Sequence, residues 1–198
     1  HRFRKFGRQD LIGSPSADST PFDRRWRGFT RVSENPWVLD HQVQNTIIYP
    51  AAGMMSMVLE AAQQIQDQDR KVDGYEISNM NILKAMIIPE TVHGLETAIN
   101  VKLHEPVSKD EVAWHEFVIY SKLLGGAWTK NADGLVAIRY KAGDIDIISN
   151  AEFKRAFENS KKVCSENMSP RQLYESLESI GMKYRPMFQN ILAVSKKD

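Results

Sequence analysis

Residues 51–66 read AAGMMSMVLEAAQQIQ and predict the long helix around which the fold is built. Its apolar residues recur at helical spacing: Ala51, Met54, Met55, Val58, Ala61, Ala62 and Ile65. Pro50 stands just before this run, at a position that the start of a helix accepts. Because few polar residues occur before Gln63, we expect most of the helix circumference to be buried.

Segments with the residue pattern of strands lie on both sides of this helix. They are 26–32, 37–43, 96–104, 114–123 and 134–140. The clearest is 96–104, in which Thr97, Ile99, Val101 and Leu103 share one face. Short connections between the later segments favour antiparallel over parallel pairing. The pattern therefore predicts an α+β fold in which an antiparallel sheet accompanies one buried helix.

A second helix is marked near the end of the chain. Ser169 is expected to be its N-cap and Pro170 its first residue, with Gln172 completing a capping box. Gly181 should end it, because glycine readily adopts the backbone conformation that follows a helix.

The composition is that of a globular protein with almost no net charge. Lys and Arg number 26, Asp and Glu number 25, and the formal net charge is +1, which argues against a nucleic-acid binder. The single cysteine, Cys164, excludes an internal disulfide framework and a Cys-rich zinc site, and it suits a reducing compartment. No segment reaches the roughly 18–20 apolar residues of a membrane span and no signal peptide opens the chain, so we expect a cytoplasmic protein.

Histidines are the natural candidates for acid–base chemistry. Four of them are expected to be solvated or structurally satisfied: His1, His93, His104 and His115. Their spacings match no zinc-binding pattern, so we expect no metal site.

His41 differs from the other histidines in its apolar surroundings, WVLDHQVQNTIIYP. On a strand, Leu39, His41 and Val43 would share one face, while Asp40 would point to the other and be a poor partner for the imidazole. A partly desolvated imidazole stays neutral, which is the form that a general base requires. A histidine with a purely structural role is the alternative interpretation.

The start of the first helix offers a second functional element. Its first amides lack partners within the helix, and they carry the positive end of the helix dipole. Ala51, Ala52 and Gly53 are small enough to let a substrate carbonyl approach these amides and be polarised. Alternatively, the small residues only let the helix pack on the sheet.

The chain contains two motifs, His41–Pro50 and, later in the sequence, Gly181–Asn190. The first, HQVQNTIIYP, is similar to the pattern HxxxGxxxxP, and the second, GMKYRPMFQN, is similar to GYxYGPxF. DLIGSP and WRGFTRV precede them as a lead-in. With these motifs the chain resembles the dehydratase domain of reducing type I polyketide synthases, especially the fungal highly reducing class. Asn45 and Arg185 depart from the pattern, because each replaces a motif glycine.

The resemblance implies a double hotdog fold, in which each half is a curved antiparallel sheet wrapped around a long helix. The chain would contain the first half and the start of the second. The expected divisions are a lead-in at 1–9, the N-terminal hotdog at 10–141, a linker at 142–168 and the truncated C-terminal hotdog at 169–198. The linker is expected to contain at most a short helix near Phe153 and Phe157.

The resemblance also implies a set of site residues. His41 matches the catalytic histidine of the family, which acts as the proton acceptor. The family's catalytic aspartate comes well after the second motif, beyond Asp198, so we expect residues 1–198 alone to be inactive. The expected substrate-binding residues are Pro50, Ala51, Ala52, Gly53, Tyr184, Pro186 and Phe188.

The implied reaction is dehydration of a β-hydroxyacyl thioester to an α,β-unsaturated thioester. No cofactor would bind directly, because the phosphopantetheine arm of an acyl carrier domain carries the substrate. The expected partners are that domain and the other domains of the same synthase, with a homodimer left open and neither nucleic acid nor membrane involved. Two alternatives remain: a non-catalytic structural or docking module, and a hotdog of the product-template or thioesterase kind.

Overall fold

The computed structural model describes residues 6–104, 112–141 and 151–197. The chain divides into two compact units, which are described separately below. The first unit contains His1–Val38 and Ile47–Lys141, and the second contains Leu39–Thr46 and Ala142–Asp198. Of the residues discussed above, residues 1–5 of the expected lead-in, which include His1, segment 142–150 of the expected linker, and Asp198 lie outside the described residues.

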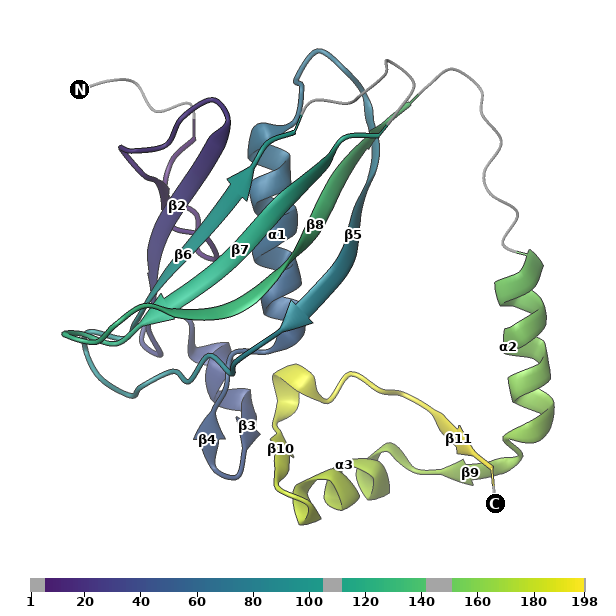
Figure 1. Cartoon of the computed structure of the whole chain (residues 1–198). Helices are drawn as coiled ribbons and strands as arrows, with labels where there is room; N and C mark the ends of the chain where they lie inside the picture. The colour runs from purple at the N-terminus through teal and green to yellow at the C-terminus, as the bar shows by residue number, and fades with distance from the viewer. Residues whose placement is uncertain (1–5, 105–111, 142–150, 198) are drawn as a thin grey trace. The chain divides into compact units, whose positions relative to one another are not determined.

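The first unit is built on a six-stranded sheet with the order β1-β2-β6-β7-β8-β5, in which every neighbouring pair is antiparallel. The strands are β1 (Ser14–Pro15), β2 (Asp23–Thr30), β5 (Val72–Ile82), β6 (Leu95–Lys102), β7 (Trp114–Lys122) and β8 (Thr129–Tyr140). Helix α1 (Ala51–Ile65) packs against β5, β6 and β8 (Figure 1). This arrangement confirms the expected antiparallel sheet around one long helix.

The core of this unit lies between α1 and one face of the sheet. Strand β6 alternates as expected, with Leu95, Thr97, Ile99 and Val101 buried and the residues between them more exposed. The buried residues of α1 are Met54, Met57, Val58, Ala61 and Ala62. The expectation of burial around most of the helix is wrong for Met55, whose side chain is 42% exposed.

The expected strand at 37–43 is wrong over most of its length. A 3₁₀ helix, η1 (Pro36–Asp40), occupies its first part, and strand β3 (His41–Val43) is only three residues long. Proline fixes its own φ near the helical value, so Pro36 favours a helical turn over a strand. The amide of Val38 closes this turn by donating to the carbonyl of Asn35 at 3.1 Å.

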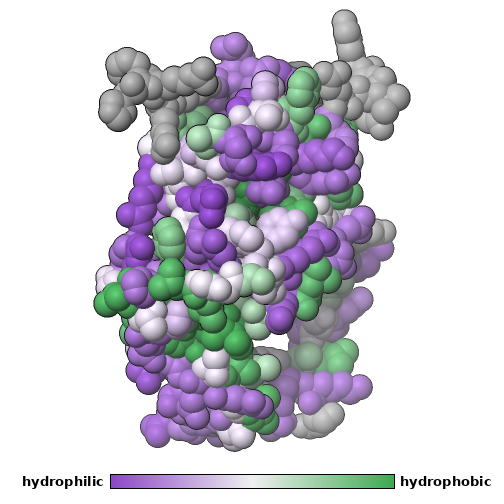
Figure 2. Space-filling view, turned by 60° about the vertical axis from the view of Figure 1, so that its left-hand side comes forward, coloured by the Kyte–Doolittle hydropathy of each residue, from purple (hydrophilic) through white to green (hydrophobic). Residues whose placement is uncertain are grey.

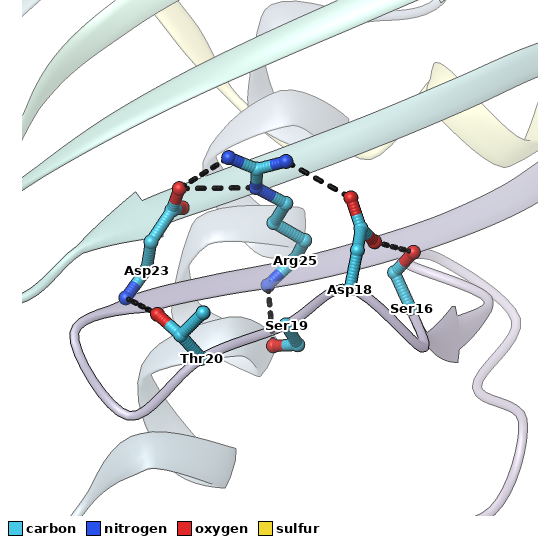
Figure 3. Close-up of polar contacts among 6 residues, drawn as sticks. All are labelled: Ser16, Asp18, Ser19, Thr20, Asp23 and Arg25. Atoms are coloured by element: carbon cyan, nitrogen blue, oxygen red, sulfur yellow. Dashed lines mark hydrogen bonds and ion pairs between the residues drawn. The ribbon is translucent and has the colours of Figure 1, made fainter.

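A network of hydrogen bonds and ion pairs connects the turn before β2 to the first residues of β2 (Figure 3). The Arg25 guanidinium donates to Asp18 at 2.9 Å and to Asp23 at 3.0 Å. The Arg25 amide donates to the Ser19 hydroxyl at 3.0 Å. Hydrogen bonds from Ser16 and then Arg25 lower the pKa of the Asp18 carboxyl. The network is partly exposed to solvent, and it orders this turn.

In the described residues of the second unit, the strands are two or three residues long and the helices are no longer than 13 residues. They are β3, β4 (Thr46–Ile47, which reaches into the first unit), α2 (Ala151–Val163), β9 (Glu166–Met168), α3 (Pro170–Ser179), β10 (Met182–Tyr184), η2 (Pro186–Phe188) and β11 (Val194–Lys196). The sheet order is β10-β3-β4, and β9 pairs with β11. Helix α2 has 13 residues and is therefore longer than the short helix expected near Phe153 and Phe157.

The start of helix α3 confirms the prediction made from its sequence. The Ser169 hydroxyl accepts a hydrogen bond from the Gln172 amide at 3.2 Å, and the Gln172 side chain accepts one from the Ser169 amide at 3.0 Å. Pro170 is the first helical residue, and Gly181 follows the helix with a φ of 89°. These are the two halves of a capping box and a glycine stop.

Hydrophobic side chains reach the surface in several places. Figure 2 shows one face of the molecule, on which green hydrophobic patches interrupt the hydrophilic surface. In α2, every residue from 153 to 163 is exposed, including Phe153 at 78% and Phe157 at 60%. Among the residues described, no helix has the length and apolar character that a membrane crossing requires.

Candidate functional site

The second unit brings the two sequence motifs together through strand pairing. Strands β3 and β10 are antiparallel, and the register places Tyr184 opposite His41 and Met182 opposite Val43. His41 begins the first motif, and Tyr184 lies in the second. Residues far apart in the sequence therefore meet in one small sheet, and the sequence motifs are parts of one local structure.

Two aromatic rings flank the imidazole of His41. The ring centroids of His41 and Tyr184 are 5.2 Å apart with planes tilted by 31°, and those of His41 and Phe188 are 5.2 Å apart with a tilt of 59°. All three residues are half-buried. Aromatic neighbours at this distance fix the orientation of a ring and remove part of its hydration. The arrangement holds an imidazole in a defined place beside apolar surface.

Asp40 accepts hydrogen bonds from the segment that contains Phe188. Its carboxylate accepts a hydrogen bond from the Met187 amide at 3.0 Å, and its carbonyl accepts one from the Arg185 amide at 2.9 Å. These bonds hold η2 against the end of η1. The sequence predicted that Asp40 would be a poor partner for His41, but it gave no signal for this role in anchoring Pro186 and Phe188.

The two positions that depart from the motif glycines adopt different backbone conformations. Gln44 and Asn45 have φ values of 49° and 59° in the turn between β3 and β4, where a tight hairpin requires positive φ. Asparagine tolerates this region better than most residues, so Asn45 fits the place of a glycine. Arg185 has an extended backbone, with φ −103° and ψ −177°, which any residue can adopt.

Helix α1 begins, in the first unit, with amides that have no partner inside the helix. Its N-cap is Pro50, which provides no side-chain cap, and the Pro50 carbonyl accepts from the Met54 amide at 3.2 Å. The amides of Ala51, Ala52 and Gly53 precede the first intrahelical bond. Ala51 and Ala52 are exposed, while Pro50 is buried. This first turn can therefore present amide donors and the positive end of the dipole to a carbonyl oxygen.

The small size of Gly53 serves packing inside the first unit. A Cβ atom at Gly53 would lie 2.7 Å from Cε1 of Tyr49, closer than real Cβ contacts allow. The Tyr49 ring is buried, and burial followed by the charge of Glu60 raises the pKa of its hydroxyl. Of the two interpretations of the small residues, packing thus explains Gly53, while Ala51 and Ala52 remain open to a ligand.

Two aromatic residues beside the helix start were not predicted as part of the site. Trp37 and Tyr49 lie with ring centroids 5.6 Å apart, and the Tyr49 amide donates to the Met86 carbonyl at 2.8 Å. The position of Tyr49 directly before Pro50 places it beside the helix start in the sequence. The sequence gives no indication that the loop containing Met86 contacts Tyr49.

The remaining described histidines, His93, His104 and His115, belong to the first unit. His93 is exposed in the turn before β6. The His104 amide donates to Nδ1 of His115 at 3.2 Å, and Nε2 of His104 lies 3.1 Å from the Glu116 carboxylate. Burial and the neighbouring His104 lower the pKa of His115. In residues 6–104, 112–141 and 151–197, no three His, Cys, Asp or Glu side chains gather as metal ligands.

Comparison with known sequences gives consistent matches. A family model described as "Polyketide synthase dehydratase domain" matches residues 10–122. A highly reducing polyketide synthase of Didymella fabae is 37% identical over 204 residues, covering 100% of this chain and 11% of that protein. The highly reducing polyketide synthase Preu1 of Preussia isomera is 32% identical over 198 residues, covering 97% of this chain and 8% of that protein. The chain therefore spans only a small part of these relatives.

Comparison with solved structures supports the same fold. The dehydratase domain from the CurF module of the curacin polyketide synthase superposes with a TM-score of 0.74 at 19% identity, covering 96% of this chain and 62% of that chain. The dehydratase domain from the CurK module gives a TM-score of 0.73 at 18% identity, with the same coverage. These similarities confirm the expected α+β hotdog fold.

Proposed function

Because this chain belongs to the polyketide synthase dehydratase family, we propose that it dehydrates a β-hydroxyacyl thioester to the α,β-unsaturated thioester. The reaction removes the α-proton and expels the β-hydroxyl group, which leaves as water after taking up a proton. A carbon–carbon double bond forms between the α and β carbons, so atoms and charge balance without an oxidant or reductant. The chemistry needs a base, an acid and a group that stabilises the enolate-like thioester oxygen.

His41 is the proposed base. The observation that carries this assignment is the position of its imidazole beside Tyr184 and Phe188, at 5.2 Å from each ring. Flanking rings restrict the orientation of the imidazole and exclude part of the water around it. A ring held in this way can take a proton from a substrate carbon with little reorganisation.

The first amides of α1 are the proposed donors to the thioester carbonyl. Ala51 and Ala52 are exposed, and Pro50 provides no side-chain cap that would compete for their amides. As negative charge develops on the carbonyl oxygen, amide donors and the helix dipole stabilise it. Pro50 and Gly53 contribute by shaping this turn.

The acid that protonates the leaving hydroxyl is proposed to be an aspartate beyond Asp198, as the family resemblance implies. Two solved structures of the CurK dehydratase support a reaction shared between a histidine and an aspartate. In one the protein is an inactive variant with histidine replaced by phenylalanine, and in the other an inactive variant with aspartate replaced by asparagine. On this proposal, residues 1–198 alone are inactive.

The substrate is proposed to arrive on the phosphopantetheine arm of an acyl carrier domain of the same synthase. The curated relatives are named as highly reducing polyketide synthases, and the chain spans 8–11% of their length, which supports a place within a larger protein. Tyr184, Pro186 and Phe188 are proposed to contact the acyl chain, because they lie on the segment beside the imidazole of His41.

Catalysis is favoured over the non-catalytic structural module. The alternative of a non-catalytic module rests on Asn45 and Arg185, which replace glycines of the family motifs. Asn45 has the positive φ that its hairpin needs, and Arg185 has an extended backbone that does not require glycine. The local structure around His41 therefore tolerates both substitutions.

The test is dehydration of a synthetic β-hydroxyacyl thioester by the full-length protein and by its His41→Ala variant. Loss of a positioned base should lower turnover by about 10²–10⁴-fold. The variant should also lose exchange of the substrate α-proton with deuterated water, which reports the base alone. His93→Ala is the matched control, because His93 is exposed, and its turnover should be unchanged. Turnover at the unmodified rate by His41→Ala would remove His41 from the mechanism.

A further inference from the structure

Asn131 is a buried polar residue at an irregular point of strand β8. Its exposed fraction is 0%. In the pairing of β7 with β8, Ile119 is opposite Ala132 and Tyr120 is opposite Lys130, so Asn131 has no partner across the strand. An extra residue of this kind is a β-bulge, which redirects a side chain out of the regular alternation of the sheet.

The bulge directs Asn131 to the loop that follows β5. Its side-chain amide donates to the carbonyls of Lys84 and Ala85, at 3.2 Å and 3.3 Å. Its backbone carbonyl accepts from the amides of Leu83 and Lys84, at 2.7 Å and 3.2 Å. Asn131 therefore binds three successive residues of the loop.

The same loop holds the segment that leads into α1. The Met86 carbonyl accepts from the Tyr49 amide at 2.8 Å, and the Ile88 amide donates to the Ile47 carbonyl at 2.9 Å. The loop therefore binds the residue directly before Pro50, the N-cap of α1. Asn131 therefore binds one end of the loop, the backbone of Ala85 and Met86 continues it, and the bond from Tyr49 to Met86 connects it to the residue before the helix N-cap.

The energetics point to a role for Asn131 beyond general stability. Its Oδ1 atom is buried and has no hydrogen-bond partner among the described residues. A buried acceptor without a partner is unfavourable, and an apolar side chain of similar size would avoid that cost. The gain that remains from asparagine is the pair of hydrogen bonds to the loop carbonyls.

We propose that Asn131 is a positioning residue for the thioester carbonyl, acting through the loop at 83–88 and Tyr49 on the first turn of α1. This inference rests on the proposed function, because it assigns the amides of Ala51 and Ala52 to the carbonyl. Loss of the two side-chain bonds loosens the loop at Lys84 and Ala85, although its backbone bonds remain, and the helix start then varies more in position. Small displacements of a group that stabilises a transition state reduce the rate much more than they reduce binding.

The test compares full-length protein with Asn131→Leu and Asn131→Thr. Leucine removes both donors and the unpaired acceptor, while threonine suits a strand and retains one donor. For Asn131→Leu we expect kcat to fall by about tenfold or more with little change in KM. Hydrogen exchange of the Tyr49 amide should become about tenfold faster in Asn131→Leu. In Asn131→Thr, both kcat and the exchange rate should lie between those of the unmodified protein and those of Asn131→Leu. Thr97→Val is the matched control, because Thr97 is a buried polar residue of the same sheet, and both readouts should stay unchanged.

The two readouts, kcat and exchange of the Tyr49 amide, test the positioning role of Asn131. An unchanged kcat, or unchanged exchange at Tyr49, in correctly folded Asn131→Leu overturns the positioning role. If Asn131→Leu does not fold, the same two readouts on Asn131→Thr decide. If the unmodified full-length protein does not dehydrate the thioester, the proposed function is refuted, and Tyr49 exchange alone then decides whether Asn131 holds the loop.

Discussion

Tyr184 lies opposite His41 in the antiparallel pair of β3 and β10, with the two ring centroids 5.2 Å apart. The contact depends on the register of three-residue strands. A shift of one residue would turn Tyr184 to the other face of the sheet and remove its ring from the imidazole. Strand register, and with it the turn at Gly181, therefore sets the surroundings of the proposed base.

We predict that Tyr184→Ala lowers kcat/KM for dehydration by about tenfold in the full-length protein. The variant removes one of the two rings that restrict the imidazole, so His41 samples more orientations. Steady-state kinetics with a β-hydroxyacyl thioester measure the effect. Tyr184→Phe keeps the ring and should stay within about twofold of the unmodified enzyme.

Lys183 offers the control for the effect of Tyr184. It is the preceding residue of β10 and is paired with Gln42, so its side chain lies on the opposite face of the strand. Lys183→Ala should leave kcat/KM unchanged. An equal loss in Lys183→Ala and Tyr184→Ala would show that β10 as a whole matters, and that the ring contact does not.

We predict that Gly53→Ala destabilises the protein although alanine favours helices. The added Cβ would lie 2.7 Å from Cε1 of the buried Tyr49 ring, and overpacking of this kind costs about 1–3 kcal/mol. The gain in helix propensity is about 1 kcal/mol, so a net loss on the order of 1 kcal/mol remains. Urea denaturation gives the free energy of unfolding.

The control for Gly53→Ala is Gly74→Ala. A Cβ atom at Gly74 would meet nothing within 4 Å, so this substitution adds a methyl group without a clash. Its free energy of unfolding should be unchanged or slightly higher. If Gly53→Ala proved as stable as Gly74→Ala, the ring contact with Tyr49 would not require glycine.

Features with a local cause could be predicted from the sequence. The helix at 51–65 follows from apolar spacing alone, and the capping box of Ser169 and Gln172 follows from two residues three apart. The error at 37–43 is local as well. Aromatic and β-branched residues there favour a strand, but Pro36 and the Asn35 carbonyl close a 3₁₀ turn first.

Features that depend on distant residues could not be predicted in this way. His41 was identified as a candidate, but its contacts with Tyr184 and Phe188 depend on the register of β10, which periodicity in one segment does not reveal. Asn131 gave no signal, because a bulge appears only when two strands are paired. Asp40 likewise has its role through amides of η2, far along the chain.

We predict that Asn45→Val destabilises the second unit by about 1–2 kcal/mol, while Asn45→Gly does not. Asn45 has a φ of 59° and is exposed, so backbone conformation determines the effect and burial does not. A β-branched residue is strained in this region, and glycine is not. Hydrogen exchange of the Gln44 amide, which donates to the Gly181 carbonyl at 2.7 Å, reports on this hairpin directly. Equal protection in the two variants would exclude a conformational requirement at this position.

We predict that protonation of His115 destabilises the first unit as the pH falls. Burial, and then the charge of His104, lower the pKa of folded His115 below its ordinary value of 6.5. The unfolded chain therefore binds the proton first, so stability is complete above about pH 6.5 and decreases below it until the folded residue also titrates. The structure explains the preference for the neutral form, because Nδ1 of His115 accepts a hydrogen bond from the His104 amide at 3.2 Å and cannot do so when protonated.

Urea unfolding between pH 8 and pH 5 measures how the free energy of unfolding depends on pH. The slope from one group is at most about 1.4 kcal/mol per pH unit. In His115→Gln the slope over this range should be smaller than in the unmodified protein, and an identical slope would assign the pH dependence to other groups.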